Sequence, residues 1–420
     1  MMKESMLESV LAYIEKSINY LPIEDVEKEN LYQLLAESEY SIDFSIKFKA
    51  NKKLKVFKAF RVLHNSLLGP YKGGIRVYWD VDLEEISGLA TLMTIKNAFL
   101  GIPFGGSKGG IRLDVKDLTE EEKEFILREY IRKLSIFIDE KTDIPAPDIG
   151  TTEKDMDIIF DEYSKIKGKN TYSIVTGKST ELLGIEFRKL STGYGIGYLT
   201  DKVIQDVFKN KEVRIVIQGF GNVGSHLFKK LEDLGYKIYG VSDSHGGIYS
   251  PEGLKFEEVL IAKDKYGTVV GLSKTKDSVK VVDTERFLEL ECDILIPAAK
   301  ENVINSDNVK NIKTKIIVEG ANSPVTEEAE NMLNQMGILV IPDILANGGG
   351  VYVSYYEWLK GNGIQNITDS FVENIMKEKL ISAYKEIDII SKNLNISYRT
   401  ASYIKALEKL YKVAKLRGVI

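Results

Sequence analysis

Residues 213–224 read VRIVIQGFGNVG, and this stretch is the strongest signal for the fold class of the chain. An apolar run leads into the pattern G-x-G-x-x-G, a helical pattern continues to about residue 234, and the next strand, KIYGVSD, ends at Asp243. Glycines between a strand and a helix let backbone amides and the helix N-terminus approach a pyrophosphate. The stretch therefore predicts a Rossmann-type dinucleotide-binding unit rather than a strand–helix turn without a ligand. The cofactor-binding candidates are Gly219, Gly221, Asn222, Val223, Gly224 and Asp243.

Three further apolar segments follow, with helical or loop segments between them. They are DILIPAA at 293–299, KIIVEGAN at 315–322 and ILVIPDILAN at 338–347. Such alternation predicts a parallel sheet that is covered on both faces. Ligands bind at the carboxyl ends of these strands, which makes three strand-end residues candidates for the nicotinamide half of a cofactor. These are Ala298, Asn322 and Asn347, although each asparagine also suits a turn or a cap.

The N-terminal half has its own pattern of elements. Residues 1–40 show helical periodicity, and alternating or apolar runs follow that are typical of strands. The predicted strands lie at 41–49, 54–65, 73–78 and 109–115, and a long amphipathic helix is predicted at 118–139.

The stretch 69–110, GPYKGGIRVYWDVDLEEISGLATLMTIKNAFLGIPFGGSKGG, carries three lysines in unusual settings. Glycines flank Lys72 and Lys108, which allows a backbone or a ligand to approach closely. The apolar stripe of a predicted helix runs through Met93 and places Lys96 on the same, buried face. A buried ammonium is costly unless an anion meets it, although a lysine can also extend off a helix end. Three such lysines together predict an anion-binding, catalytic pocket.

Composition limits the possible classes of function. The chain has 420 residues and a formal net charge of −5, so it is long enough for two or three domains and shows no sign of a nucleic-acid or membrane polycation. Its one cysteine, Cys292, cannot form an internal disulfide and fits a reducing compartment. The N-terminal pattern is amphipathic and acidic, unlike a signal peptide, and no apolar run reaches ~18 residues. We therefore expect a cytoplasmic protein with a small-molecule substrate, and no metal site is predicted.

The first domain resembles that of a known family in four segments: GPYKGGIR (69–76), LMTIKNA (92–98), GGSKGG (105–110) and PAPDIG (145–150). They are similar to the glutamate dehydrogenases of the Glu/Leu/Phe/Val dehydrogenase family, and matching segments recur to the C-terminus. The resemblance implies an α/β fold in which a Rossmann-type, doubly wound nucleotide domain (188–349) is inserted into an α/β substrate domain with a mixed sheet. That substrate domain would comprise residues 1–187 and be completed by C-terminal helices at 350–420. The family is typically hexameric, which implies a homo-oligomer.

The resemblance also assigns roles to residues. Lys96 would hold the substrate α-carboxylate, and Lys108 would activate the water that attacks the iminium formed after hydride leaves Cα. Asp148 would carry the proton to and from the amine, while Lys72 and Ser354 would hold a γ-carboxylate. Crowded, dehydrated ammonium groups have lowered pKa values, which suits Lys108 as a base. The remaining family positions are Met93 and Arg188 for the substrate and Thr192 for the cofactor.

The implied reaction is the reversible, NAD(P)-dependent oxidative deamination of L-glutamate to 2-oxoglutarate and ammonia. A leucine, valine or phenylalanine dehydrogenase of the same family is the first alternative, and it would lack the lysine found here at Lys72. A catalytically silent, NAD-binding regulatory paralogue is the second, and it would have lost Lys108 or Asp148, which are both present.

One segment departs from the family pattern. Where relatives read G-S-x-G-R followed by A-T-G-R-G, this chain reads GIEFR at 184–188 and STGYG at 191–195. The serine and the second glycine are lost, while Arg188 and Thr192 remain. Ser323 also stands where the family has glycine. By the resemblance, the segment 184–195 would lead into the nucleotide domain and border the active site.

The cofactor prediction depends on the end of the second nucleotide-domain strand. A carboxylate at Asp243 would accept hydrogen bonds from the adenosine ribose and repel a 2′-phosphate, which favours NAD. Its neighbours Ser242, Ser244 and His245 carry groups able to donate to a phosphate. We therefore predict NAD as the preferred cofactor, with NADP possible.

Overall fold

The computed structural model describes residues 5–50, 53–208 and 212–420. The chain forms two compact units. The first comprises 1–186, 351–372 and 402–420, and the second comprises 187–350 and 373–401. No helix within the described ranges has the length and apolarity needed to cross a membrane.

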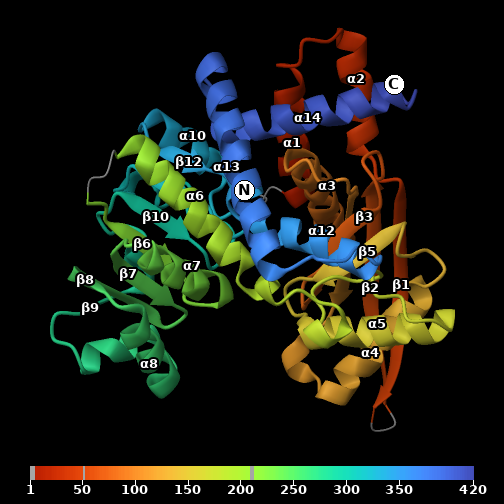
Figure 1. The fold of residues 1–420 in the computed structure, drawn as a ribbon, viewed down its shortest axis with the longest axis horizontal. Coiled ribbons are helices and arrows are strands. Elements are labelled where there is room, and N and C mark those ends of the chain that lie inside the picture. The colour runs from red at the N-terminus through yellow and green to blue at the C-terminus, as the bar shows by residue number, and fades with distance from the viewer. Residues whose placement is uncertain (1–4, 51–52, 209–211) are drawn as a thin grey trace. The chain divides into compact units, whose positions relative to one another are not determined.

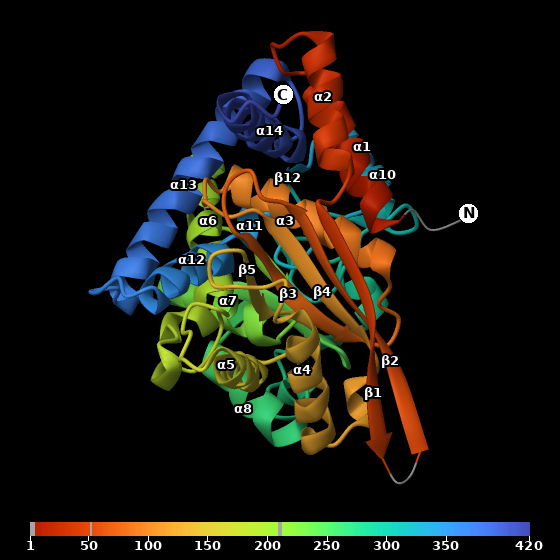
Figure 2. The ribbon, with the colours of Figure 1, turned by 90° about the vertical axis from the view of Figure 1, so that its right-hand side faces the viewer.

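The first unit is built on a mixed sheet with the strand order β1-β2-β4-β3-β5. Its strands are β1 (Tyr40–Ala50), β2 (Lys53–Asn65), β3 (Tyr71–Tyr78), β4 (Gly106–Arg112) and β5 (Asp143–Pro147). The hairpin β1–β2 is antiparallel, β2 is antiparallel to β4, and β3 is parallel to both β4 and β5. Figure 2 shows β1 and β2 as long neighbouring strands beside β4 and β3. This arrangement confirms the mixed sheet that the resemblance implied.

Helices pack on both faces of this sheet. Helix α3 (Leu83–Phe99) covers one face, and α4 (Glu120–Leu134) and α5 (Glu153–Lys167) cover the other. Helix α1 (Met6–Ile18) packs on α3, and α2 (Asp25–Ala36) packs on α1. Parts of α12 (Gly349–Gly361), α13 (Asp369–Leu394) and α14 (Tyr398–Leu416) complete the unit. The helix predicted at 118–139 begins at Glu120, where Thr119 and Glu122 form a capping box, and ends at Leu134. The strand predicted at 109–115 begins earlier, at Gly106, so Lys108 lies within a strand.

The second unit is a doubly wound sheet with the order β12-β11-β10-β6-β7-β8-β9. Its strands are β6 (Ile215–Gln218), β7 (Ile238–Asp243), β8 (Gly246–Leu254), β9 (Lys280–Val282), β10 (Ile294–Pro297), β11 (Ile316–Val318) and β12 (Leu339–Ile341). Figure 1 shows this sheet in green to teal. The five strands from β12 to β7 are parallel, whereas β8 and β9 are antiparallel additions. The parallel arrangement predicted from the alternating segments is confirmed for β6, β7, β10, β11 and β12. The strands β8 and β9 were not predicted, and β8 runs antiparallel to β7 because only residues 244–245 join them.

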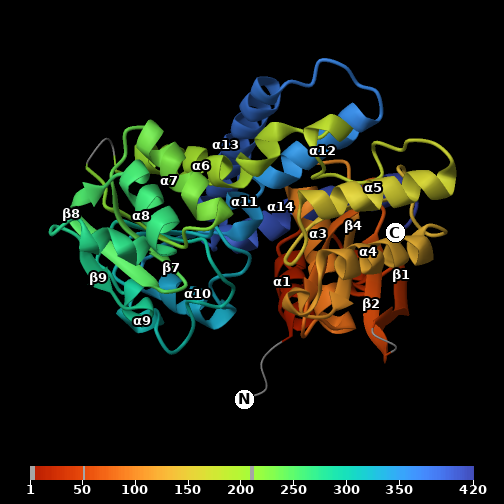
Figure 3. The same ribbon diagram turned by 90° about the horizontal axis from the view of Figure 1, so that it is seen from below.

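Helices cover both faces of the second sheet, as predicted. They are α6 (Ser191–Val207), α7 (Asn222–Asp233), α8 (Phe256–Tyr266), α9 (Thr284–Phe287), α10 (Glu327–Gln335) and α11 (Asp343–Ala346). Val216, Leu295 and Ile317 point to the face covered by α9 and α10, while Ile217 on the opposite face contacts α7. Figure 3 shows α7 and α8 on one side of this sheet and α9 and α10 on the other. The burial of both faces explains why these strands are continuous apolar runs.

Two boundaries differ from the sequence expectation. The segment 338–347 was expected to be one strand, but β12 ends at Ile341 and α11 begins at Asp343. Pro342 has no N–H to continue the ladder, and its fixed φ suits a helix start. The C-terminal segment 350–420 also divides between the units, because 373–401 belongs to the second. In α13, for example, Met376 and Leu380 pack closely on glycines of the second unit.

Candidate active site

One face of the first sheet gathers the charged candidates. In the parallel pair β3–β4, Ile75 lies opposite Gly109, and in β3–β5, Gly74 lies opposite Ala146. Because side chains alternate along a strand, this register places four charged residues on the same face. The four are Lys72, Arg76, Lys108 and Asp148. A Cβ built on Gly74 would lie 2.8 Å from the Asp148 Cβ, so only glycine fits there.

Helix α3 covers this face and contributes the third lysine. Phe60 and Val62 of β2 form a buried cluster with Ile86 and Ala90 of α3, which fixes the helix on the sheet. The lysines themselves are almost fully enclosed: Lys72 is 2%, Lys96 7% and Lys108 6% exposed. Met93, one turn before Lys96, is half-buried. The prediction that Lys96 lies on a buried helix face is confirmed.

Asp148 is the anion that meets Lys108. Its Oδ2 lies 2.9 Å from Lys108 Nζ and accepts a hydrogen bond from Arg76 Nε at 3.0 Å, and Arg76 also pairs with Glu85. Burial lowers the pKa of Lys108, and nearby Arg76 and Arg61 lower it further against the attraction of Asp148. Burial would raise the pKa of Asp148, but Lys108 and Arg76 outweigh it and hold that pKa at about 2. The result is an ionised carboxylate beside a lysine that gives up its proton more readily than usual.

Arg76 is the site residue that the sequence analysis missed. It lies in GGIRVY, within the stretch that carries the lysines, and alternates with Lys72 on β3. Strand periodicity counted from Lys72 would have placed it on the same face. Its contact with Asp148 joins residues 72 positions apart in the chain, which only the β3–β5 pairing reveals.

On the opposite face of the sheet, Arg61 connects the strands that carry Lys72 and Lys108. Fully buried Arg61 donates to both oxygens of Asp143, at 2.6 and 2.8 Å, to Ser107 Oγ at 2.9 Å and to the Gly73 carbonyl at 3.2 Å. Ser107 Oγ donates to the same aspartate at 2.8 Å. Gly73 and Ser107 directly adjoin Lys72 and Lys108, respectively. Arg61 therefore holds the backbone beside two of the three lysines.

Ser354 lies in the middle of α12 and is buried. One turn later, Glu357 accepts hydrogen bonds from the Gly177 N–H at 2.9 Å and from Lys178 Nζ at 2.8 Å, in an ion pair with no exposed side chain. Thr176 in the same loop donates its N–H to Pro145 of β5 at 3.1 Å. These contacts tie the helix that carries Ser354 to the strand that leads into Asp148.

The glycine loop of the second unit has the geometry that a pyrophosphate needs. Gly219 adopts φ +106°, in the region that favours glycine. A Cβ on Gly221 would meet nothing within 4 Å, whereas a Cβ on Gly224 would lie 1.9 Å from the Gly219 carbonyl oxygen. Gly221 caps α7 without a side-chain hydrogen bond, so the first amides of the helix are left to a ligand or solvent. These observations fit a dinucleotide phosphate at this loop, beside Asn222 and Val223.

The structure brings the other strand-end candidates together. Ala298 donates its N–H to the Gln218 carbonyl at 2.8 Å and lies beside both Gly219 and Gly320. Asn347 Nδ2 donates to Asn322 Oδ1 at 2.9 Å. The ends of β6, β10 and β11 therefore meet, as expected. Asn347, however, is the C-cap of α11 rather than the end of a strand.

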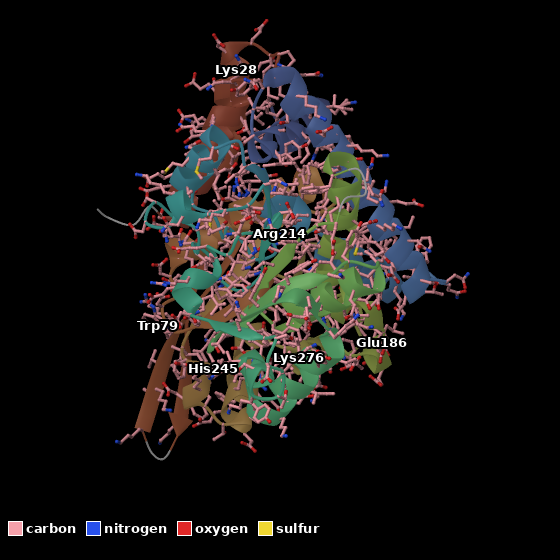
Figure 4. The ribbon with its side chains drawn as sticks, turned by 90° about the vertical axis from the view of Figure 1, so that its left-hand side faces the viewer. Lys28, Trp79, Glu186, Arg214, His245 and Lys276 are labelled. Atoms are coloured by element: carbon pink, nitrogen blue, oxygen red, sulfur yellow. The ribbon has the colours of Figure 1, made fainter. Side chains whose placement is uncertain are left out.

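Asp243 is turned into the protein. Its carboxylate accepts hydrogen bonds from Lys263 Nζ at 2.6 Å, from Thr268 Oγ1 at 3.0 Å, and from the N–H groups of Val269 and His245, each at 2.9 Å. Burial would raise the pKa of Asp243, but these donors, Lys263 foremost, lower it. Protein donors thus already engage both carboxylate oxygens that were expected to meet the ribose. His245, labelled in Figure 4, has a side chain that is 65% exposed.

The segment that departs from the family pattern folds as a 3₁₀ helix over Glu186–Lys189. Buried Phe187 packs edge-on against Tyr194 with ring centroids 5.8 Å apart. A Cβ on Gly350 would lie 3.0 Å from Arg188 Nη1 and 3.1 Å from Thr192 Oγ1, so both retained residues border this glycine. The structure therefore keeps Arg188 and Thr192 together despite the changed residues before them.

Two family models match the chain. Residues 184–418 match "Glutamate/Leucine/Phenylalanine/Valine dehydrogenase", and residues 38–165 match "Glu/Leu/Phe/Val dehydrogenase, dimerisation domain". The glutamate dehydrogenase of Aeropyrum pernix is 40% identical over 420 residues, 99% of each chain. The NADP-specific enzyme of Saccharolobus shibatae is 40% identical over 92% of each chain, and the NAD-specific enzyme of Staphylococcus aureus is 38% identical over 93% of this chain and 94% of its own.

Solved structures agree with the sequence comparisons. The hetero-hexameric glutamate dehydrogenase of Thermus thermophilus, in a leucine-bound form, superposes with a TM-score of 0.89 at 30% identity, covering 99% of this chain and 97% of its own. The glutamate dehydrogenase of Peptoniphilus asaccharolyticus gives 0.85 at 32% identity, covering 99% and 100%. With the family models and the full-length relatives, these matches show that the chain belongs to the Glu/Leu/Phe/Val dehydrogenase family of NAD(P)-dependent amino-acid dehydrogenases.

Proposed function

We propose that this chain is a glutamate dehydrogenase that interconverts L-glutamate with 2-oxoglutarate and ammonia, using NAD or NADP. The observation that carries the proposal is the buried Lys72, on the same sheet face as Lys108 and Asp148. A second enclosed cation suits a substrate with two carboxylates and has no use beside an apolar side chain. Relatives named glutamate dehydrogenase over nearly the whole chain support this choice.

Substrate recognition would divide among three elements of the first unit. Lys96 on α3 would bind the α-carboxylate, and Lys72 on β3, with Ser354 on α12, would bind the γ-carboxylate. A dicarboxylate held at both ends presents its Cα–H in one orientation, which lowers the entropic barrier to reaction. Met93 and Arg188 would complete the substrate contacts.

The proton steps would belong to Lys108 and Asp148. Asp148 is ionised near neutrality, so it can take a proton from the substrate ammonium before hydride leaves Cα. After the hydride has left Cα, water attacks the resulting iminium and Lys108 would remove a proton from that water. Asp148 would then return its proton to the amine, which leaves as ammonia while the hydroxyl group loses its proton to give the 2-oxo acid. The lowered pKa of Lys108 supports this role as a base. Arg76, by holding Asp148, would be a positioning residue.

The cofactor would lie on the second unit. The Gly219–Gly224 loop and the α7 amides would hold the pyrophosphate, and Ala298, Asn322, Asn347 and Thr192 would border the nicotinamide half. When bound, the cofactor accepts the hydride that leaves the substrate Cα. Asp243 would shape the part of the site that binds the adenosine ribose, because its hydrogen bonds order the turn that follows β7. We keep NAD as the preferred cofactor, with NADP possible.

One set of assays tests the substrate and the cofactor together. NAD and NADP reduction would each be measured with glutamate, leucine, valine and phenylalanine. The proposal expects glutamate to give the highest kcat/KM with at least one cofactor. A higher kcat/KM for leucine, valine or phenylalanine would show that the chain is a dehydrogenase of the same family with that amino acid as its substrate. If neither cofactor is reduced with any of the amino acids, a catalytically silent paralogue is favoured.

We also propose that the first unit is the substrate domain, the second is the nucleotide domain, and the chain forms a homo-hexamer in the cytoplasm. The hexameric glutamate dehydrogenase of Thermus thermophilus and the dimerisation-domain match support the assembly. Light scattering should then give six times the 47.3 kDa of one chain. A monomeric mass would contradict the assembly, and cell fractionation would test the location.

A further inference from the structure

A cluster of buried charges lies directly behind the strand ends of the second unit. Arg399 Nη2 lies 2.6 Å from Glu319, its Nη1 lies 2.8 Å from Asp343, and its Nε pairs with Glu330. Glu319 follows β11, Glu330 lies on α10, Asp343 begins α11 and Arg399 lies in the first turn of α14. All four side chains are buried, so one guanidinium joins four elements.

Hydrogen bonds connect this cluster to the loops that contain Asn322 and Asn347. Asp343 donates its N–H to Glu319 Oε2 at 2.7 Å, and its Oδ2 accepts from the Ser323 N–H at 3.0 Å. Ser323 has φ +42°, a left-handed conformation that is unfavourable for a residue other than glycine. The cluster therefore anchors a strained residue directly after Asn322. Asn347 ends α11, the helix that Asp343 begins.

The cluster contains more acid than base. Three carboxylates face one guanidinium, and water does not reach them to screen the excess negative charge. Burial raises the pKa of Glu319 to about 8, because Asp343 and Glu330 add to the effect and Arg399 only partly offsets it. The charged groups that face Glu319 are Arg399 from α14, Asp343 from α11 and Glu330 from α10. Burial and the two neighbouring acids therefore favour the neutral form of Glu319, whereas the donors Arg399 and Asp343 N–H favour the carboxylate.

We propose that Arg399 is a positioning residue for the cofactor, which holds Asn322 and Asn347 in place through Glu319 and Asp343. The inference rests on the proposed function, because it takes these asparagines to border the nicotinamide. It goes further by assigning the geometry of that half-site to a buried arginine from the C-terminal helix. A cation is needed because an uncompensated set of three buried acids would repel one another and release the loops.

The first test replaces the arginine. Arg399→Lys keeps the charge but loses the fork that reaches three carboxylates, and it should weaken NADH binding roughly tenfold to a hundredfold, because only the fraction of molecules with the loops in place would bind the cofactor. The KM for glutamate should change far less than the KM for the cofactor. Amides at 320–323 and 343–347 should also exchange hydrogen faster in the variant without ligand. An unchanged Kd for NADH, or an equal loss for both substrates, would overturn the proposal.

A matched control lies at the other end of the same strands. Arg214, labelled in Figure 4, precedes β6, and Lys315 precedes β11; both pair with Asp293. Arg214→Met should lower the melting temperature without changing the Kd for NADH. A loss of NADH binding in this control as large as that in Arg399→Lys would show general destabilisation and overturn the positioning role.

The acid side of the cluster gives a variant expected to keep the fold. Glu319→Gln keeps the size of the side chain and one acceptor oxygen for Arg399 and the Asp343 N–H but has no charge to gain or lose, so its Kd for NADH at pH 7 should rise less than that of Arg399→Lys. In the wild type the Kd should rise as pH passes about 8, when Glu319 loses its proton, and the variant should lack this rise. The same pH dependence in both proteins would overturn the proposal. Because binding is measured without turnover, a wild type that binds NADH but does not oxidise glutamate would refute only the proposed substrate.

Discussion

The residues assigned to chemistry in the first unit are charged and lie on strands, whereas those assigned to the cofactor in the second are mostly glycine, alanine and asparagine in loops. Lys108, Arg76 and Asp148 meet on the covered face of the first sheet. In the second unit the charges nearest the loops, Asp243 and Arg399, are directed into the protein. In the proposed function the first unit would use buried charge to act on a substrate, and the second would use it to hold the backbone of the cofactor loops. Substitutions should therefore change kcat or substrate choice in one and cofactor affinity in the other.

The largest expected effect is on Lys108. Lys108→Ala should reduce kcat by ~10²–10⁴, the usual loss for removing an acid–base group, while the Kd for NADH stays the same. Exposed Lys154, which pairs with Glu120 on the same unit, provides the control, and Lys154→Ala should leave kcat unchanged. Near-normal turnover of Lys108→Ala in a stopped-flow or steady-state assay would remove Lys108 from the mechanism.

Lys72 should control substrate choice. In Lys72→Leu an enclosed γ-carboxylate loses its cation, which costs several kcal/mol or roughly 10²-fold in kcat/KM, whereas an apolar amino acid loses little. The measurement is the ratio of kcat/KM for glutamate to that for leucine or norvaline. If both substrates lose activity equally, Lys72 does not recognise the γ-carboxylate.

Asp148 should make the stability of the fold depend on pH in the acidic range. Its folded pKa of about 2 is below the ordinary 3.8, so the ionised group stabilises the fold above pH ~4, and this contribution disappears as the pH falls toward 2. The shift corresponds to about 2 kcal/mol. Melting temperatures from pH 5 to pH 2.5 should therefore fall more steeply in the wild type than in Asp148→Asn. Parallel curves would show that Lys108 and Arg76 do not stabilise the ionised carboxylate.

The smallest expected effect concerns cofactor preference. Asp243→Ser removes a negative charge near the ribose end and releases Lys263, so kcat/KM should shift toward NADP by about 1 kcal/mol, roughly fivefold. Asp233→Ser, at the far end of α7 in an exposed pair with Lys229, should not move the ratio. A wild type that already prefers NADP strongly, or an unmoved ratio in Asp243→Ser, would contradict NAD preference.

Much of the candidate site could be predicted because its signals are local. The spacing of Gly219, Gly221 and Gly224 alone predicted a turn with a close backbone approach. The structure shows open space beside Gly221 and a tight contact between Gly224 and the Gly219 carbonyl oxygen. The buried position of Lys96 followed from helical periodicity alone. The strand–helix boundary at Pro342 was misplaced, since a short apolar run is compatible with either element.

The Rossmann unit, the lysine-rich face and the family could be predicted from the amino-acid sequence, because glycine geometry, periodicity and long ordered motifs depend on residues that are neighbours in the chain. Only the tertiary structure showed that Arg76 meets Asp148, that Asp243 faces inward and that Arg399 gathers three acids. These contacts join residues 20 to 80 positions apart. Their pKa shifts arise from burial and from charges brought close by packing, and neither is encoded in any single stretch of the chain.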